Sequence, residues 1–219
     1  MNLQDGITSA EHAPLIRAVS ARTLAHVTVA LAAIVLAHLL DGWTYRNVRV
    51  ENIYSEDWGR MLRVMGFLPL WFMAAIALWL HERPATWRRP LMLALSPALA
   101  GLAAELLKLL LRRERPNAHD GLYYFRPFTE RTFSTGGLAL PSSHAVVAFG
   151  AAAILSRLFP RARTIWWALA WGCGLTRVAA GAHFVSDVVV AAIVGWLVGA
   201  GVWKWLSRSK AATQEATCP

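Results

Sequence analysis

The stretch "ALPSSHAVVAFGAAAIL" (residues 139–155) joins a short polar signal directly to a long apolar run. From Ala145 to Leu155 every residue is apolar or glycine. A run of this kind is typical of a helix that lies in lipid. Ser142, Ser143 and His144 come just before it, and serine is a preferred residue at the start of a helix. The sequence therefore places a hydroxyl pair and an imidazole at one end of an apolar helix.

The composition extends this interpretation to the whole chain. Of the 219 residues, 56% are hydrophobic and only 16% are charged, whereas about 25% charged residues is usual in soluble domains. The eleven tryptophans cluster near the ends of apolar runs, as in the aromatic belts of membrane proteins. We therefore predict an integral membrane protein. The net charge of +9 favours contact with an anionic lipid bilayer. No aromatic-interleaved basic motif indicates binding to nucleic acid, and no protein partner is identifiable.

Apolar runs close to the length of a membrane span, about 20 residues, occur six times. They predict helices at 24–42, 61–81, 90–111, 143–159, 164–182 and 187–206. Because backbone groups in lipid must bond within their own segment, we predict an all-α fold. The expected architecture is a six-transmembrane-helix bundle, one domain over residues 1–219, with the active site at one membrane face.

The segments between these runs differ in character. Residues 43–60 mix charged and aromatic side chains and are expected at the membrane interface. Residues 112–141 form a long loop, and a loop of this length is usually functional or disordered. Its aromatic residues and prolines favour a packed loop over the site.

The orientation in the membrane is predicted from the acidic residues. Basic residues divide equally between the two sides, so the positive-inside rule does not decide. The acidic residues gather in the segments on the side away from the N-terminus. We therefore predict a multi-pass protein with both termini cytoplasmic and with residues 43–60 and 112–141 on the opposite side of the membrane.

The direction of successive helices brings three polar segments together. Each helix carries the chain to the other side of the membrane. The end of the third predicted helix, the start of the fourth and the turn between the fifth and the sixth therefore lie on the same side. This places "KLLLRRERP" (108–116), "PSSH" (141–144) and "TRVAAGAHFVSD" (176–187) at one face. Ionisable groups at membrane depth are usually functional. Their convergence predicts a site.

The residue types at this face suit a phosphate group. Lys108 and Arg115 are seven residues apart and share a helix face if the helix continues to Pro116. Arg177 adds a third cation. Ser142 and Ser143 begin a helix whose free N–H groups and positive dipole end attract anions.

Two histidines near these possible phosphate-binding residues could carry out a reaction. His183 and Asp187 are four residues apart, on one face of a helix start. The carboxylate can fix the imidazole tautomer and leave the other ring nitrogen as a nucleophile. His144 can then protonate the leaving oxygen.

These segments resemble the three signatures of the type-2 phosphatidic acid phosphatase superfamily, which includes lipid phosphatases, soluble bacterial acid phosphatases and vanadium haloperoxidases. The six-helix plan resembles its membrane branch. The residues that match the superfamily pattern are Lys108, Arg115 and Pro116 in the first segment, Pro141, Ser142 and His144 in the second, and Arg177, His183 and Asp187 in the third. Two positions depart from the pattern: Ser143 replaces the usual glycine, and Thr176 replaces the usual serine.

The resemblance implies a reaction and a role for each residue. His183 attacks phosphorus and forms a phosphohistidine, His144 protonates the leaving group and Asp187 orients His183. The residues expected to bind phosphate are Lys108, Arg115, Ser142, Ser143 and Arg177. No metal and no cofactor is expected. The implied substrate is a membrane lipid phosphate: a polyprenyl diphosphate, phosphatidylglycerol phosphate, phosphatidic acid or a lipid of the lipid A type.

Other interpretations of the same residues stay open at this point. A lipid phosphotransferase would use the same phosphohistidine, and a transport or lipid-binding protein would use no chemistry at all. Asp187 and Arg177 alone fit a structural ion pair, and Glu105 either orients Lys108 or only neutralises it. Four arginines near the expected mouth either attract anionic substrate or extend to headgroups: Arg112, Arg113, Arg126 and Arg131.

Overall fold

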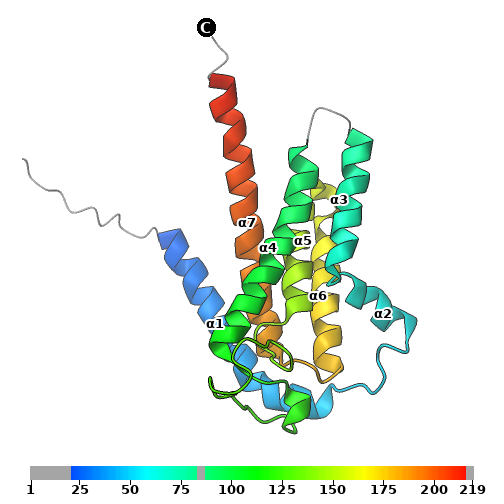
Figure 1. Ribbon diagram of the computed structural model, residues 1–219, viewed down its shortest axis with the longest axis vertical. Helices are drawn as coiled ribbons and strands as arrows, with labels where there is room; N and C mark the ends of the chain where they lie inside the picture. Colours follow the sequence, from blue (N-terminus) through cyan, green and yellow to red (C-terminus); the bar gives the residue numbers. More distant parts are fainter. Residues whose placement is uncertain (1–20, 83–86, 216–219) are drawn as a thin grey trace, which may run out of the picture.

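The computed structural model describes residues 21–82 and 87–215 as a helical bundle (Figure 1). Seven α-helices lie in these ranges: α1 Ala21–Asn47, α2 Asp57–Val64, α3 Leu68–Glu82, α4 Arg88–Leu111, α5 Ser143–Leu158, α6 Arg163–Ala179 and α7 Val185–Glu215. Two 3-10 turns, η1 Pro116–Ala118 and η2 Pro160–Ala162, complete the elements. The predicted all-α fold is confirmed. The first 20 residues and the last four, which hold the termini predicted to be cytoplasmic, lie outside the described residues.

The predicted number of six membrane spans is not confirmed. Three of the described helices are long and apolar enough to cross a bilayer: α1 from Thr23 to Asn47, α4, and α7 from Val185 to Arg208. The pair α2 and α3 adds a fourth span if it is counted as one. α5 and α6 have 16 and 17 residues. At 1.5 Å per residue they are about 24–26 Å long, which is shorter than a hydrocarbon core of about 30 Å.

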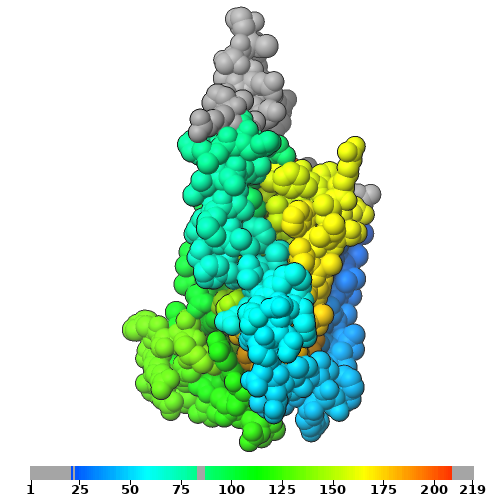
Figure 2. All heavy atoms as spheres, turned by 90° about the vertical axis from the view of Figure 1, so that its right-hand side faces the viewer, coloured from blue at the N-terminus to red at the C-terminus, as the bar shows by residue number. Residues whose placement is uncertain are grey.

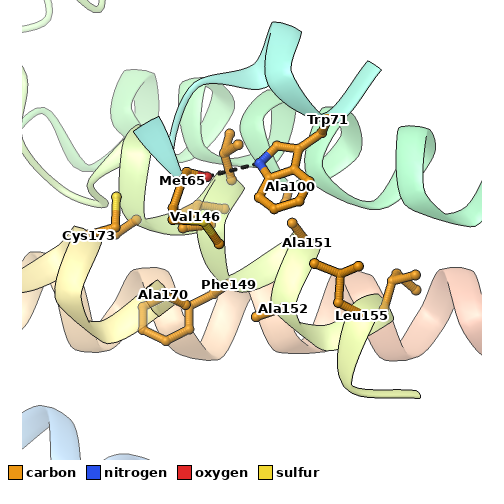
Figure 3. Close-up of a cluster of buried hydrophobic side chains, with 14 of the residues drawn as sticks. Met65, Trp71, Ala100, Val146, Phe149, Ala151, Ala152, Leu155, Ala170 and Cys173 are labelled. Atoms are coloured by element: carbon orange, nitrogen blue, oxygen red, sulfur yellow. Dashed lines mark hydrogen bonds between the residues drawn. The ribbon is translucent and has the colours of Figure 1, made fainter. Parts of the chain in front are cut away.

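The helix predicted at 61–81 is broken, and α2 and α3 meet at a bend of 64°. Gly66 lies in the break because the chain passes directly against the start of α5. A Cβ atom at this glycine would lie 2.6 Å from the Cβ of His144. The indole nitrogen of Trp71 donates to the Met65 carbonyl at 2.9 Å and fixes the bend (Figure 3). The predicted interfacial segment 43–60 is likewise divided: residues 43–47 finish α1, and residues 57–60 begin α2.

α5 is the central helix of the bundle. It packs against α4, α6 and α7, and its residues from Ala145 to Leu155 are all buried. The all-round apolar run in the sequence is explained by this position. Phe149 and the small residues around it fill the middle of the core (Figure 3). This packing presents the N-terminal end of α5, with Ser142 and His144, at the same end of the bundle as the long loop.

The loop 112–141 folds over that end of the bundle (Figure 1), next to the part of the chain that leads into α2 (Figure 2). α4 ends at Leu111, as predicted, so the helix does not continue to Arg115 and the condition for a face shared with Lys108 is not met. The helix ends there because Arg112 adopts a left-handed backbone with φ of 53° and its N–H bonds the Lys108 carbonyl at 2.8 Å. This is a common way for a helix to end.

The arginines of this loop hold it together from inside. Arg112, Arg113 and Arg126 are at least 95% buried, so their expected position around an open mouth is wrong; Arg131 is exposed. The Arg112 guanidinium group donates to backbone carbonyls of the loop, at 2.9 Å to residue 126 and 2.8 Å to residue 127. A buried guanidinium group needs such partners because an unpaired charge is costly to bury.

A carboxylate next to Arg115 ties the two sides of the loop together. Arg126 donates to Glu114 at 2.6 Å, and the His119 ring nitrogen Nε2 donates to its other oxygen at 2.7 Å. Burial alone would raise the pKa of Glu114, but the hydrogen bonds from His119 and Arg126 outweigh it and lower the pKa below its usual 4.5. The ionised form of Glu114 therefore stabilises the loop that carries Arg115.

The close approach of α5 and α7 predicts a stability difference between two glycines of α7. A Cβ at Gly195 would lie 2.7 Å from the Cβ of Phe149, whereas a Cβ at Gly201 would meet nothing within 4 Å. Because overpacking a tight contact costs about 1–3 kcal/mol, Gly195→Val should lower the thermal unfolding midpoint in detergent. Gly201→Val is the matched control and should leave it unchanged. Equal midpoints for the two variants would contradict this packing.

The lowered pKa of Glu114 predicts a loop that loosens in acid. A carboxylate with a depressed folded-state pKa contributes stability above its unfolded pKa and loses it as the pH falls through the folded value. Hydrogen exchange of amides 112–141, corrected for intrinsic rates, should therefore accelerate as the pH falls below about 4.5. In Glu114→Gln the same amides should already exchange at the faster rate at neutral pH, and this rate should not increase further as the pH falls.

The control for this experiment is Glu130→Gln, because Glu130 is an exposed acid of the same loop. This variant should exchange like the unaltered protein at every pH. A further increase of this rate at low pH in Glu114→Gln would show that another group governs the loop.

Candidate active site

The three polar segments meet at the end of the bundle under the loop. Lys108, in the last turn of α4, donates to the Ser143 hydroxyl at the start of α5. The backbone N–H of Ser142 donates to the Asp187 carbonyl at 3.3 Å. His183 donates from Nδ1 to the Ala139 carbonyl at 3.0 Å. Residues far apart in the sequence thus form one site.

Arg115, Arg177 and His144 belong to the same cluster. Arg177 and Lys108 lie close enough for their charges to act on His144, and the charge of Arg177 also acts on Arg115. Every predicted site residue is therefore brought to this end of the bundle. The Arg115 side chain comes from the extended chain just before η1.

His183 lies in the turn between α6 and α7, two residues before the helix start on which it was expected to share a face with Asp187. α7 begins at Val185, and Gly181 turns the chain with a φ of +65°. A carbonyl oxygen can only accept, so the bond to Ala139 places a hydrogen on Nδ1 and leaves Nε2 with a free lone pair. Burial lowers the pKa of His183 and outweighs the opposing effect of Asp187. The neutral ring therefore presents Nε2 as a possible nucleophile.

Asp187 holds several groups at once. Its side chain is fully buried. One oxygen accepts from the Arg113 guanidinium, and the other accepts from the Phe184 N–H at 2.7 Å and lies 3.5 Å from His183 Nδ1. Asp187 therefore orients His183 together with the Ala139 carbonyl. The alternative of an ion pair between Asp187 and Arg177 is wrong, because the cation bonded to Asp187 is Arg113.

α1 contributes a buried carboxylate that the sequence analysis missed. Asp41 accepts from the Ser186 N–H at 2.9 Å, from the Ser186 hydroxyl, and from the Tyr123 hydroxyl at 2.7 Å. Ser186 also accepts from Arg113 at 2.8 Å, which links Asp41 to Asp187. Burial and the contact with Asp41 raise the pKa of Tyr123. A single acid inside the apolar run 24–42 was the signal that could have identified it.

Lys108 is held by two side chains. It lies 3.0 Å from Glu105, and the Ser143 hydroxyl donates to the same glutamate oxygen at 2.6 Å. Glu105 therefore does more than neutralise a charge: it shares a three-residue cluster with the lysine and the serine. Ser143 is outside the left-handed backbone region, so the serine in place of the usual glycine carries no backbone strain of that kind.

Three predicted phosphate ligands have buried donor atoms without a partner among the described residues. They are Nε of Arg115, the hydroxyl of Ser142 and Nε of Arg177. Ser142 precedes α5 as its N-cap, but its hydroxyl forms no capping bond. A buried donor without an acceptor costs about 1–3 kcal/mol. A bound oxyanion would relieve this cost at several atoms together, and the helix dipole of α5 favours negative charge at this point.

An apolar groove of about 510 Å³ reaches the site from the side of the bundle. It opens between the α2–α3 bend, α4 and α5. Its lining residues are Gly66, Phe67, Leu68, Pro69, Ala98, Gly101, Leu102, Glu105, Ser143, His144 and Val147. Within residues 21–82 and 87–215, no three histidine, cysteine, aspartate or glutamate side chains gather closely enough to hold a metal ion.

Comparison with known proteins places this chain in a family. Two curated relatives, from Rhizobium etli and Rhizobium johnstonii, are both named lipid A 1-phosphatase. They are 39% and 38% identical to this chain over 100 and 98 residues. Each match covers 44% of this chain, with 42% and 39% of the relatives, so the chain spans about two fifths of their length. The family model of the PAP2 superfamily matches residues 89–211, more than half of the chain. The chain therefore belongs to the PAP2 superfamily.

Proposed function

We propose that this protein is an integral membrane phosphatase that removes a phosphate group from a membrane lipid through a phosphohistidine at His183. The observation that carries the proposal is the neutral imidazole of His183, which has Nε2 free and lies in one cluster with three cations. Membership of the superfamily and the names of the two relatives support the class of reaction.

The first step transfers the phosphoryl group to the enzyme. The Nε2 lone pair of His183 attacks phosphorus, the P–N bond forms and the bond from phosphorus to the lipid oxygen breaks. His144 takes up a proton when the anionic phosphate binds beside it and gives this proton to the departing oxygen. Lys108, Arg115 and Arg177 face the non-bridging oxygens and stabilise the charge that spreads over them. Asp187 and the Ala139 carbonyl keep the ring in one tautomer.

The second step returns the enzyme to its starting state. Water attacks phosphorus, the P–N bond breaks and inorganic phosphate leaves. The proton released by the water passes to His144, which is neutral after the first step. The cations supply the electrostatic stabilisation, so we propose that the reaction proceeds without a metal ion.

The serine at position 143 receives a role different from the one first expected. Its hydroxyl is engaged by Glu105 and Lys108, so we assign the side chain to holding Lys108 in place. Its backbone N–H, at the first position of α5, stays the phosphate donor. The Ser142 hydroxyl, which has no partner, is the serine side chain that binds the phosphate.

The apolar groove supports a lipid as the substrate. His144 and Ser143 are among its lining residues, so an acyl or prenyl chain can lie between α4 and the α2–α3 bend while its phosphate reaches the cations. Each buried methylene adds about 0.8 kcal/mol to binding. We propose that the site faces the periplasmic side of a bacterial inner membrane and that the lipid enters from that leaflet.

Substitution of the two histidines tests the assigned roles. With chelator present, the solubilised protein should release inorganic phosphate from lipid phosphates, and His183→Ala should reduce release to background. His144→Ala should lose about 10²–10⁴-fold, the usual contribution of a general acid. A lipid phosphate with a good leaving group should partly restore only the His144 variant, because its oxygen departs without protonation.

Three results would contradict the proposal. They are equal rescue of both variants, activity that depends entirely on an added divalent ion, and hydrolysis of water-soluble phosphates as efficient as that of lipids. Transfer of the label to a second lipid in place of water would assign a phosphotransferase with the same phosphohistidine.

A further inference from the structure

A second cavity, of about 540 Å³, lies on the other side of Arg177. One wall is the segment 49–55 between α1 and α2, and the other is the turn that leads from α6 to His183. Ala182, the residue before His183, lines it. A chemical group bound in this cavity would therefore lie next to the proposed phosphate site, because Arg177 lines both. The apolar groove approaches the same site along a different set of residues.

Three arginines line this cavity: Arg49, Arg63 and Arg177. Among the described residues, no carboxylate oxygen lies within 4.0 Å of their side-chain nitrogens. Glu51 also lines the cavity but forms no ion pair with them. Arg177 is 95% buried, and its Nε atom has no hydrogen-bond partner in the part of the chain that the structure describes. The cavity thus holds a surplus of positive charge that its own side chains do not neutralise.

Tyr54 brings two of these charges close together. Its ring lies under the Arg63 guanidinium at 4.6 Å and the Arg177 guanidinium at 5.5 Å, measured to the ring centroid. Its hydroxyl accepts from Arg177 at 2.8 Å and donates to the Thr176 carbonyl at 3.2 Å. Two cations on one aromatic ring repel each other, and an anion between them would offset that repulsion.

The segment that carries Arg49 is fixed to the bundle. The Val50 N–H donates to the Ala179 carbonyl at 2.8 Å, and Ile53 is buried against the backbone of Gly59. Arg49 itself packs over Gly181, the turn residue next to Ala182. The wall of the cavity is therefore fixed, and it carries the buried Arg177 together with two exposed arginines, Arg49 and Arg63.

We propose that this cavity binds a second anionic group of the lipid headgroup, adjacent to the phosphate that reacts. The inference rests on the proposed function and narrows it: the preferred substrates are lipids with two anionic groups in the headgroup. The reacting phosphate occupies the proposed phosphate site, the lipid chain occupies the apolar groove, and the second anion lies against Arg49 and Arg63.

A matched pair of lipids tests the proposal by binding. Dioleoyl phosphatidic acid carries one phosphate, and dioleoyl phosphatidylglycerol phosphate carries a phosphodiester as well. Affinities are measured in neutral detergent micelles with a His183→Ala background, so that no lipid is consumed. Because hydrogen bonds to charged groups are strong, the second lipid should bind about tenfold more tightly. Arg49→Gln and Arg63→Gln should each reduce that preference about fivefold.

The matched control is Arg60→Gln, on the same helix as Arg63 but paired with Asp57 outside the cavity. It should keep the full preference. Arg63 also acts on His144, but a general effect on the site would change both lipids alike and leave their ratio constant. The proposal is overturned if the protein with the unaltered cavity binds the two lipids equally well. It is also overturned if Arg49→Gln and Arg63→Gln leave the ratio of the two affinities unchanged.

The binding of inorganic phosphate to the same variants provides a second test. If the substitutions weaken only the binding of free phosphate and leave the lipid ratio intact, the cavity is a product site and the substrate proposal fails. Phosphate release by the protein with an intact His183 is measured separately. Its absence would refute the proposed function, whereas a lipid ratio of one would refute only the role of the cavity.

Discussion

A fully buried carboxylate, Asp187, requires a cation, and the site is arranged around the one that it receives. Arg113 supplies that charge from the loop 112–141, and the Phe184 N–H supplies a further hydrogen bond. Breaking such a buried pair by removing one partner costs about 3–5 kcal/mol, because the other charge is left uncompensated. The pair therefore ties the loop to α7 and fixes the turn that carries His183. Through Ser186, Asp41 extends this connection to α1.

The remaining cations are held apart from that carboxylate. Lys108 is bonded by Glu105 and Ser143, while Arg115 and Arg177 have few acceptors of their own. Such a concentration of positive charge at the end of a bundle is unfavourable unless an anion binds. The buried hydroxyl of Ser142 and the start of α5 lie at the same point. The cations that the proposed phosphate site requires are thus the ones that Asp187 does not neutralise.

Much of this arrangement follows from the sequence. The apolar run after His144 predicted a helix at 143–159, which the structure has at Ser143–Leu158, and the alternating direction of the helices predicted that the three polar segments meet. These two inferences depend on hydrophobicity and chain direction, which a single sequence records well. The bend at Gly66 was not predicted, because it results from the contact with His144 across the bundle. The burial of Arg112 and Arg113 was also missed, since their partners are loop carbonyls and the distant Asp187.

The central claim is that phosphate passes through His183, and trapping the labelled enzyme tests it most directly. Protein incubated with a lipid carrying radioactive phosphate is stopped within milliseconds in alkali, where a phosphohistidine survives, and then exposed to acid, where it is hydrolysed. The account predicts transient label on a peptide that contains His183, loss of this label in acid, and no label in His183→Ala. Full turnover without label on the protein, or acid-labile label that persists in His183→Ala, would contradict the account.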